Sequence, residues 1–397
     1  MQPASSSTDT HLNITQAYPI KKGQRFEGFD LLRAIFAVAI IAYKTQIFYI
    51  PKLWAPGTFT TALSDYVLSG MLGALAVPVF LQISLFIFQL KTKDAGLRYF
   101  IRKRLRRLVS LYLFWVGLIT AFDILFVDGL DAVKFAITSP KSFLLFVVSG
   151  NSTPYFFFFS LIFLTIIAEI LVLFFSSIDE ISTRFKISYN LLFASSILVF
   201  AFSTIEPIIL HTGIQSSFLR DLSNLTRWDY SPLNFLPYVF TAAITAQEYN
   251  IGKLDHLTSF LKRKLYCLFG LTLVLFTAEW ILTSDKLLIQ VDQAPLDHYM
   301  RLSLVSGSWL LLYLSLFIER KLPAFIKSLA ACSLGIYGFH VFFTFKRPLP
   351  LKSIPMLGDL FQAFPLLHIL AIFWITLIGS ITLTVACKKF KILRELT

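Results

Sequence analysis

Residues 155–175 read YFFFFSLIFLTIIAEILVLFF and contain a single charged side chain, that of Glu169. A helix rises 1.5 Å per residue, so about 20 consecutive apolar residues are needed to cross the hydrocarbon core of a bilayer. This run has the required length and composition. It predicts a transmembrane helix and places the chain among integral membrane proteins.

Nine further apolar runs lie on either side of this stretch. They cover residues 29–50, 68–90, 109–127, 188–205, 233–247, 265–283, 301–318, 325–345 and 364–386. The run 233–247 is the weakest, because it is short and Pro237 interrupts it. Small polar residues in the run 325–345 favour packing inside a bundle. We therefore predict an all-α fold, a polytopic membrane bundle of about ten transmembrane helices.

The overall composition agrees with this class. Of the 397 residues, 56% are hydrophobic and 15% are charged, whereas a soluble domain carries about 25% charged residues. The net charge of +13 does not indicate nucleic-acid binding, because the basic residues form short blocks between apolar runs. The three cysteines have no metal-ligand spacing, so we expect no metal and no bound cofactor.

The basic blocks also predict an orientation. If the N-terminus is cytoplasmic, the inner segments hold more than twice as many lysine and arginine residues as the outer ones, as the positive-inside rule requires. We expect an integral membrane protein with both termini in the cytoplasm, in the plasma (inner) membrane if the source is bacterial. The expected parts are a disordered cytoplasmic tail (1–28), a ten-helix transmembrane domain (29–388) and a cytoplasmic C-terminal tail (389–397).

Polar features also occur near the expected outer ends of the spans. Asp123 and Glu279 lie close to such ends, and we expect their carboxylates to reach water. Asn151-Ser-Thr153 and Asn224-Leu-Thr226 fit the N-glycosylation sequon in expected outer loops, which matters only in a eukaryote.

Ionisable groups at membrane depth are costly, so each is a candidate for function. The first run carries Asp30 and Arg33 at its inner end and Lys44 in its outer half. Arg33 and Lys44 are 11 positions apart, about three turns, so they share a helix face roughly 16 Å apart along the axis. In the alternative interpretation, Asp30 and Arg33 anchor the helix at the headgroups and Lys44 extends to the outer interface.

The third span is preceded by the basic sequence FIRKRLRRL, residues 100–108. Arg104 and Arg107 share a helix face at a spacing of three. Two guanidinium groups at a membrane surface suit a phosphorylated ligand, such as a nucleotide-bearing acyl donor. A positive-inside anchor or a contact with anionic lipid is the alternative, and it fits Lys103 and Arg106 better than this pair.

The ninth span contains the sequence SLGIYGFH, in which Ser333, Tyr337 and His340 are spaced by four and three residues. These side chains should therefore stack on one helix face and could line a buried polar site. A structural histidine with satisfied hydrogen bonds is an equal alternative. Glu169, deep in the fourth span, needs a partner, which Arg33 or the Arg104/Arg107 pair could supply.

In their order and helix placement, five motifs resemble those of the membrane acyltransferase-3 family, ten-helix enzymes that acylate carbohydrates and other extracytoplasmic acceptors. The resemblance covers nearly the whole chain. The motifs are EGFDLLRA at 27–34, similar to LD-x-x-R; PVFLQIS at 78–84, similar to FF-x-x-SG; RLRRLVSLY at 104–112, similar to R-x-x-R; FFFFSL at 156–161, similar to WF-x-x-x-L; and SLGIYGFH at 333–340, similar to S-x-x-IY-x-x-H.

The chain departs from the family pattern at several positions. Leu85 replaces the usual glycine, Ser110 replaces a common proline, and phenylalanine replaces a tryptophan in the fourth motif. The largest departure is Lys44, which stands where the family has the histidine expected to act as base. Lysine is protonated near neutral pH, so Lys44 could act as a base only where desolvation or a nearby cation favours its neutral form. Otherwise His340 substitutes for it, or acyl transfer is lost.

The resemblance implies that the ten-helix domain (29–388) is acyltransferase-like and that the protein is a membrane-bound O-acyltransferase. It would move an acyl group, with acetyl expected, from a cytoplasmic acyl-CoA-type co-substrate to a hydroxyl of a carbohydrate or glycolipid acceptor. The donor would meet Arg33, Arg104 and Arg107, Lys44 or His340 would act as base, and supporting roles would fall to Asp30, Ser84, Glu169, Ser333 and Tyr337. Membrane lipid and the acceptor are the expected partners, with no nucleic acid.

Two other functions remain open on the sequence alone. A catalytically silent relative would bind a lipid or glycan without turnover. A secondary transporter is the other alternative, although the chain has no matching pair of Gly/Pro-broken helices in two halves, which many transporters have.

Overall fold

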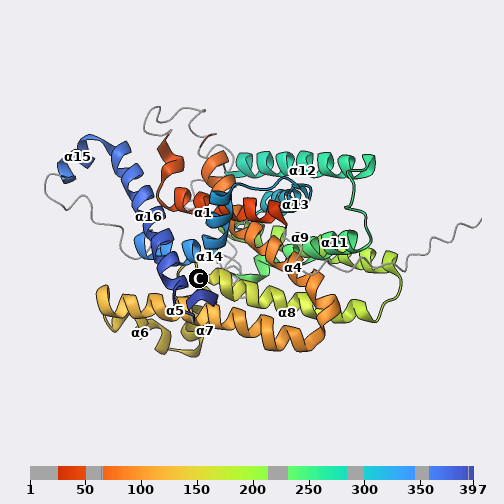
Figure 1. The fold of residues 1–397 in the computed structure, drawn as a ribbon, viewed down its shortest axis with the longest axis horizontal. Coiled ribbons are helices and arrows are strands. Elements are labelled where there is room, and N and C mark those ends of the chain that lie inside the picture. Colours follow the sequence, from red (N-terminus) through yellow and green to blue (C-terminus); the bar gives the residue numbers. More distant parts are fainter. Residues whose placement is uncertain are drawn as a thin grey trace, which may run out of the picture.

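The structure of the protein is a computed structural model, which describes residues 26–50, 64, 66–212, 231–283, 299–344, 357–391 and 393–397. The described residues form helices and contain no strand, which confirms the all-α prediction (Figure 1). Residues 1–25 of the expected N-terminal tail, and the sequon at Asn224, lie outside the described part of the chain.

Each of the ten predicted runs falls on a helix of this structure. The main helices are α1 (Glu27–Lys44), α4 (Ala76–Tyr99), α5 (Arg106–Phe126), α8 (Phe156–Ser176), α9 (Ile181–Thr212), α11 (Leu236–Asn250), α12 (Ser259–Thr283), α13 (Leu302–Leu316), α14 (Ala324–Thr344) and α16 (Pro365–Lys388). The shorter ones are η1 (Ile47–Tyr49), η2 (Tyr66–Gly73), η3 (Phe100–Leu105), α6 (Asp131–Ile137), α7 (Pro140–Ser149), η4 (Pro232–Phe235), α15 (Leu357–Ala363) and η6 (Leu393–Glu395).

Six helical segments among the described residues are long and apolar enough to cross a membrane. They are Gly70–Thr92, Gly96–Phe126, Phe156–Ser176, Ser259–Ile281, Ala324–Thr344 and Pro365–Lys388. Helices α11 and α13 have only 15 residues each, and α1 carries both acidic and basic side chains. The membrane class is therefore supported, whereas the count of ten spans stays a prediction.

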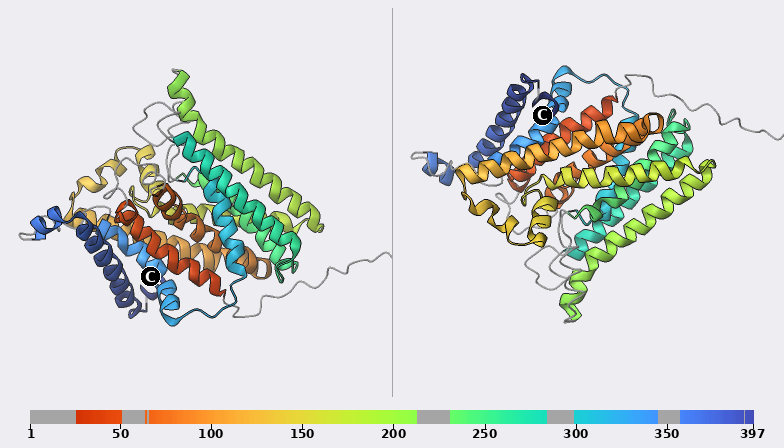
Figure 2. Two further views of the ribbon diagram at one scale, coloured as in Figure 1. Left: turned by 90° about the horizontal axis from the view of Figure 1, so that it is seen from above. Right: turned by 90° about the horizontal axis from the view of Figure 1, so that it is seen from below.

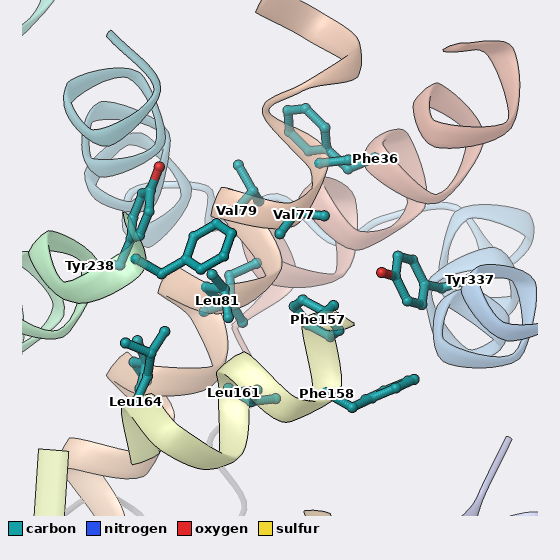
Figure 3. Packing of buried hydrophobic residues seen from close by; sticks show 14 of the residues in the cluster. Phe36, Val77, Val79, Leu81, Phe157, Phe158, Leu161, Leu164, Tyr238 and Tyr337 are labelled. Atoms are coloured by element: carbon teal, nitrogen blue, oxygen red, sulfur yellow. The ribbon is translucent and has the colours of Figure 1, made fainter. Parts of the chain in front are cut away.

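Helix α4 lies at the centre of the bundle, where it packs against α1, α8, α11 and α13. Figure 2 shows α16 and α9 at opposite edges, with α4 between them. Figure 3 shows how Leu81 of α4 packs near Leu161 and Leu164 of α8, while Tyr238 and Tyr337 approach from α11 and α14. All five side chains are buried. This shared apolar core holds the helices that carry the predicted motifs in fixed positions.

Small residues let α14 approach its neighbours closely, as its composition predicted. A Cβ atom added to Gly335 would lie 2.3 Å from Oγ1 of Thr384 on α16, and one added to Gly338 would lie 2.1 Å from the Trp115 ring on α5. Neither position has room for a side chain. The two glycines therefore set the distance from α14 to both partner helices.

Two carboxylates inside the bundle, those of Glu248 and Glu279, form ion pairs with basic residues from other segments. Lys264 lies 2.6 Å from Glu248, and both contact the hydroxyl of Tyr313. Glu279 forms an ion pair with Arg301 at 3.1 Å and is only 8% exposed. The expectation that Glu279 reaches water is therefore wrong, because its charge is compensated inside the protein.

Asp123 likewise does not reach water, since its side chain is fully buried. The amide nitrogen of Asn151 donates a 3.0 Å hydrogen bond to its carboxylate and lies 3.3 Å from the Thr120 hydroxyl. Asn151 is 7% exposed. The atom that glycosylation would modify is thus occupied inside the fold, which argues against use of this sequon.

Candidate functional site

A cavity of about 640 Å³ lies among α1, α4, α5, α8 and α14, with the end of α16 and η6 beside it. Its lining combines charged groups with aromatic ones. The charged and polar lining residues are Asp30, Arg33, Ser84, Arg104, Arg107, Ser333, Lys388, Arg394, Glu395 and Thr397, and the aromatic ones are Phe80, Phe157, Phe158 and Tyr337. The volume is in the range of small-molecule and cofactor sites.

The three arginines predicted to bind the donor all line this cavity. Arg104 donates a 2.5 Å hydrogen bond from Nη2 to the hydroxyl of Ser84 on α4. Its Nε is buried and has no hydrogen-bond partner among the described residues. Arg33 and Arg107 are close enough to act electrostatically on Arg104. Three like charges held together in this way favour a ligand with several negative charges.

Local structure explains how the arginines meet. The chain widens into a π-helical turn at η3 before α5 begins, and this turn carries Arg104 toward α4. Arg33 extends from α1, where its Nη1 lies 3.6 Å from Oδ1 of Asp30. Asp30 is itself buried and lines the cavity. The carboxylate offsets one of the positive charges and holds the Arg33 side chain near the site.

A further part of the cavity lining is aromatic. Tyr337 of α14 donates a hydrogen bond to the backbone oxygen of Pro154, and its ring centroid lies 5.2 Å from that of Phe157 on α8 (Figure 3). Ser333 lines the same wall one turn away. The lining of α14 extends from Ala330 to Tyr337, which is about 10 Å along a helix axis. One ligand could therefore contact the arginines with one end and the aromatic wall with the other.

His340 and Lys44 lie outside the cavity lining. His340 is fully buried; its Nδ1 is 2.6 Å from the backbone oxygen of Tyr337, and its Nε2 has no hydrogen-bond partner in the described part of the chain. Lys44, the last residue of α1, acts electrostatically on His340. His340 therefore lies one turn beyond Tyr337 on α14, and Lys44 on α1 is close enough to act on it electrostatically. Of the three residues expected on one face of α14, only Ser333 and Tyr337 line the cavity.

Glu169 is not part of this site. Its side chain is 2% exposed, and neither carboxylate oxygen has a hydrogen-bond partner among the described residues. Among the described residues, Glu169 forms no ion pair with Arg33, Arg104 or Arg107. Its supporting role stays a prediction without a geometric link to the arginines.

Sequence reasoning missed the contribution of residues 388–397. We expected a tail from 389 onward, yet Thr397 is 4% exposed and lines the cavity with Arg394 and Glu395. Lys388 lines it too, and its ammonium group donates a 2.7 Å hydrogen bond to the backbone oxygen of Ala331. The only signal was the block of basic residues, which orientation alone could explain. No group of three or more potential metal-ligating side chains occurs among the described residues.

Comparison with known proteins identifies a family. The family model described as an acyltransferase domain matches residues 26–385, nearly the whole chain. No curated protein and no solved structure matches the chain significantly. The match includes every predicted site residue and ends before Lys388.

Proposed function

The chain belongs to the acyltransferase-domain family, and from this premise we propose that it transfers an acyl group, with acetyl expected, from a cytoplasmic acyl-CoA-type donor to a hydroxyl of a carbohydrate or glycolipid. The observation that carries the proposal is the convergence of Arg33, Arg104 and Arg107 on one cavity. A family match alone would not say where a donor binds.

The donor fits the two ends of the cavity. Its phosphate groups would lie against the arginines, because guanidinium groups form paired hydrogen bonds with phosphate oxygens. Its uncharged arm and thioester would extend along Ser333 toward Tyr337 and Phe157. The positive-inside distribution of basic residues supports a cytoplasmic position for the arginines, on the side where acyl-CoA is available.

The reaction also needs a general base, on the side of the thioester where the acceptor hydroxyl binds. A base removes the proton from the acceptor hydroxyl, the oxygen forms a bond to the thioester carbonyl carbon, and the carbon–sulfur bond breaks. The proton then passes to the departing thiolate, so that the free thiol and the acyl ester are the products. His340 follows Tyr337 by one turn on α14, and Lys44 acts on it electrostatically, so an acceptor that approached from the extracytoplasmic side would meet these two candidate bases.

One specific observation favours a second candidate function. Lys44 occupies the position at which the family histidine is expected, and a protonated lysine cannot accept a proton. A relative that binds the donor or a lipid without turnover would keep the arginine cavity and lack acyl transfer.

The test is thiol release from acetyl-CoA by purified protein in lipid nanodiscs, with and without sugar or glycolipid acceptors, together with direct binding of CoA. We expect CoA binding and acceptor-dependent thiol release in the wild type. Arg104→Gln should weaken both, whereas Lys103→Gln should weaken neither, because Lys103 is exposed and lies outside the cavity lining. Binding without turnover would favour the silent relative, and absence of CoA binding would contradict the proposed donor.

A further inference from the structure

Residues beyond the family match form one wall of the donor cavity. The match ends at residue 385, whereas Lys388, Arg394, Glu395 and Thr397 line the cavity together with the arginines of α1 and α5. We infer that this segment, named here the closing wall (Lys388 and residues 393–397), is a functional part of the donor site, and that Arg394 binds a phosphate group of the donor. The inference rests on the proposed function.

Contacts with the bundle hold the closing wall in place. Lys388 donates a hydrogen bond to the backbone oxygen of Ala331 on α14, and its Nζ lies 3.7 Å from the Cys332 sulfur. Leu396 packs against the main apolar core, and Thr397 is 4% exposed. A free tail would have none of these contacts. The segment is therefore positioned by the same helix that supplies Ser333 and Tyr337.

The charge of the cavity supports a phosphate-binding role for this wall. Lys388 and Arg394 join the three arginines, so five basic side chains line the cavity against two acidic ones, Asp30 and Glu395. Asp30 is engaged by Arg33. The excess of positive charge suits a donor with several phosphate groups, because charge-assisted hydrogen bonds to phosphate are about twice as strong as neutral ones.

The two basic residues of the wall have different roles. Lys388 is partly buried and already donates to a backbone oxygen, so it mainly anchors the wall on α14. Arg394 is exposed toward solvent while lining the cavity, so its guanidinium group is accessible to a ligand. Arg394 is for this reason the residue on which the test depends.

The test measures CoA binding to the full-length protein in nanodiscs by isothermal titration calorimetry. Arg394→Gln should weaken CoA binding about tenfold, because it removes a charge-assisted hydrogen bond to a phosphate oxygen. Lys391→Gln is the matched control: it removes the same charge from an exposed side chain three residues away that does not line the cavity, and it should leave binding unchanged. Arg394→Lys should recover part of the affinity.

Pantetheine, which lacks phosphate, separates a local effect from a distorted cavity. It should bind equally to the wild type and to Arg394→Gln. If Arg394→Gln binds CoA as tightly as the wild type does, while Arg104→Gln binds it more weakly, the inference is overturned and the proposed function stands. If the wild type binds no CoA, the proposed function fails, and the inference fails with it.

Discussion

The guanidinium group of Arg104 donates a 2.5 Å hydrogen bond to the hydroxyl of Ser84, which joins η3, just before α5, to the middle of α4. The bond fixes the orientation of the guanidinium plane while Nε remains without a hydrogen-bond partner in the described part of the chain. Arginine can hold Ser84 and a ligand at once because it has five N–H donors. Two motifs that are separate in the sequence therefore meet on one wall of the candidate site.

Replacement of Arg104 by lysine should raise the KM for the acyl donor about tenfold or more, with a smaller change in kcat. A single ammonium group cannot reproduce the planar fork that contacts both partners, and a lost charged hydrogen bond is worth about 1.5–3 kcal/mol. Steady-state kinetics over a range of acetyl-CoA concentrations measure the effect. The reverse exchange at the neighbouring position, Lys103→Arg, is the control and should leave KM and kcat unchanged. Equal KM values for Arg104→Lys and Lys103→Arg would contradict the donor-binding role of Arg104.

Lys44 and His340 can be separated by kinetics. We expect Lys44→Ala to lower kcat about 100-fold or more, the usual contribution of general base catalysis, with little change in the KM for the donor, because Lys44 does not line the cavity. His340→Gln should lower kcat to a smaller extent if the buried imidazole only assists Lys44.

The variant Lys44→His tests the opposite hypothesis, that Lys44 is not the base. If the wild type and Lys44→Ala are equally inactive while Lys44→His gains activity, Lys44 is not the base and the chain is a silent relative. If instead His340→Gln has the larger effect on kcat, His340 is the base.

Sequence patterns predicted the fold class and several residues that line the candidate cavity, because both depend on local chemistry. Apolar runs of membrane length identified the helices, and the spacing of Arg104 and Arg107 identified one cationic face. The pattern could not reveal which distant residues meet, such as Arg104 with Ser84. It also missed Arg394, because a basic residue after the last span satisfies the positive-inside rule whether or not it returns to the bundle.

Burial of Asp123 and Glu279 was missed for a related reason. A carboxylate near the end of an apolar run has access to water unless another segment covers it. The covering residues, Asn151 and Arg301, come from other parts of the chain, and their positions follow from tertiary packing rather than from the period of the helix.

The contact between Gly338 and Trp115 predicts a large cost for one methyl group. A Cβ atom at position 338 would lie 2.1 Å from the Trp115 ring, so Gly338→Ala should lower the free energy of unfolding by about 1–3 kcal/mol, the usual cost of overpacking. Gly117→Ala on α5 is the control, because nothing lies within 4 Å of its added Cβ. That variant should be neutral or more stable by about 0.5–1 kcal/mol, since alanine favours a helix. Thermal unfolding in one detergent compares them, and equal loss in both would contradict the packing argument.

Asn151 combines a backbone role with a hydrogen-bonding role, and two substitutions distinguish them. Its φ angle is +60°, a conformation that asparagine and glycine tolerate better than other residues. Asn151→Gly should lose only the hydrogen bonds to Asp123 and Thr120, at a cost of about 1–3 kcal/mol for a buried polar group left unsatisfied. Asn151→Ala should lose these bonds and also add backbone strain of about 1 kcal/mol or more, so it should unfold at a lower temperature than Asn151→Gly.

The same environment predicts that the sequon at Asn151 is not used. Its amide nitrogen donates to the buried Asp123 carboxylate, and a glycan on that nitrogen would need the surrounding segment to open. When the protein is expressed in eukaryotic cells, endoglycosidase treatment should therefore release no glycan from the tryptic peptide that contains Asn151, as measured by mass spectrometry. A glycan at this position on folded protein would show that the loop between α7 and α8 is open, and the hydrogen bond to Asp123 would then not describe the native state.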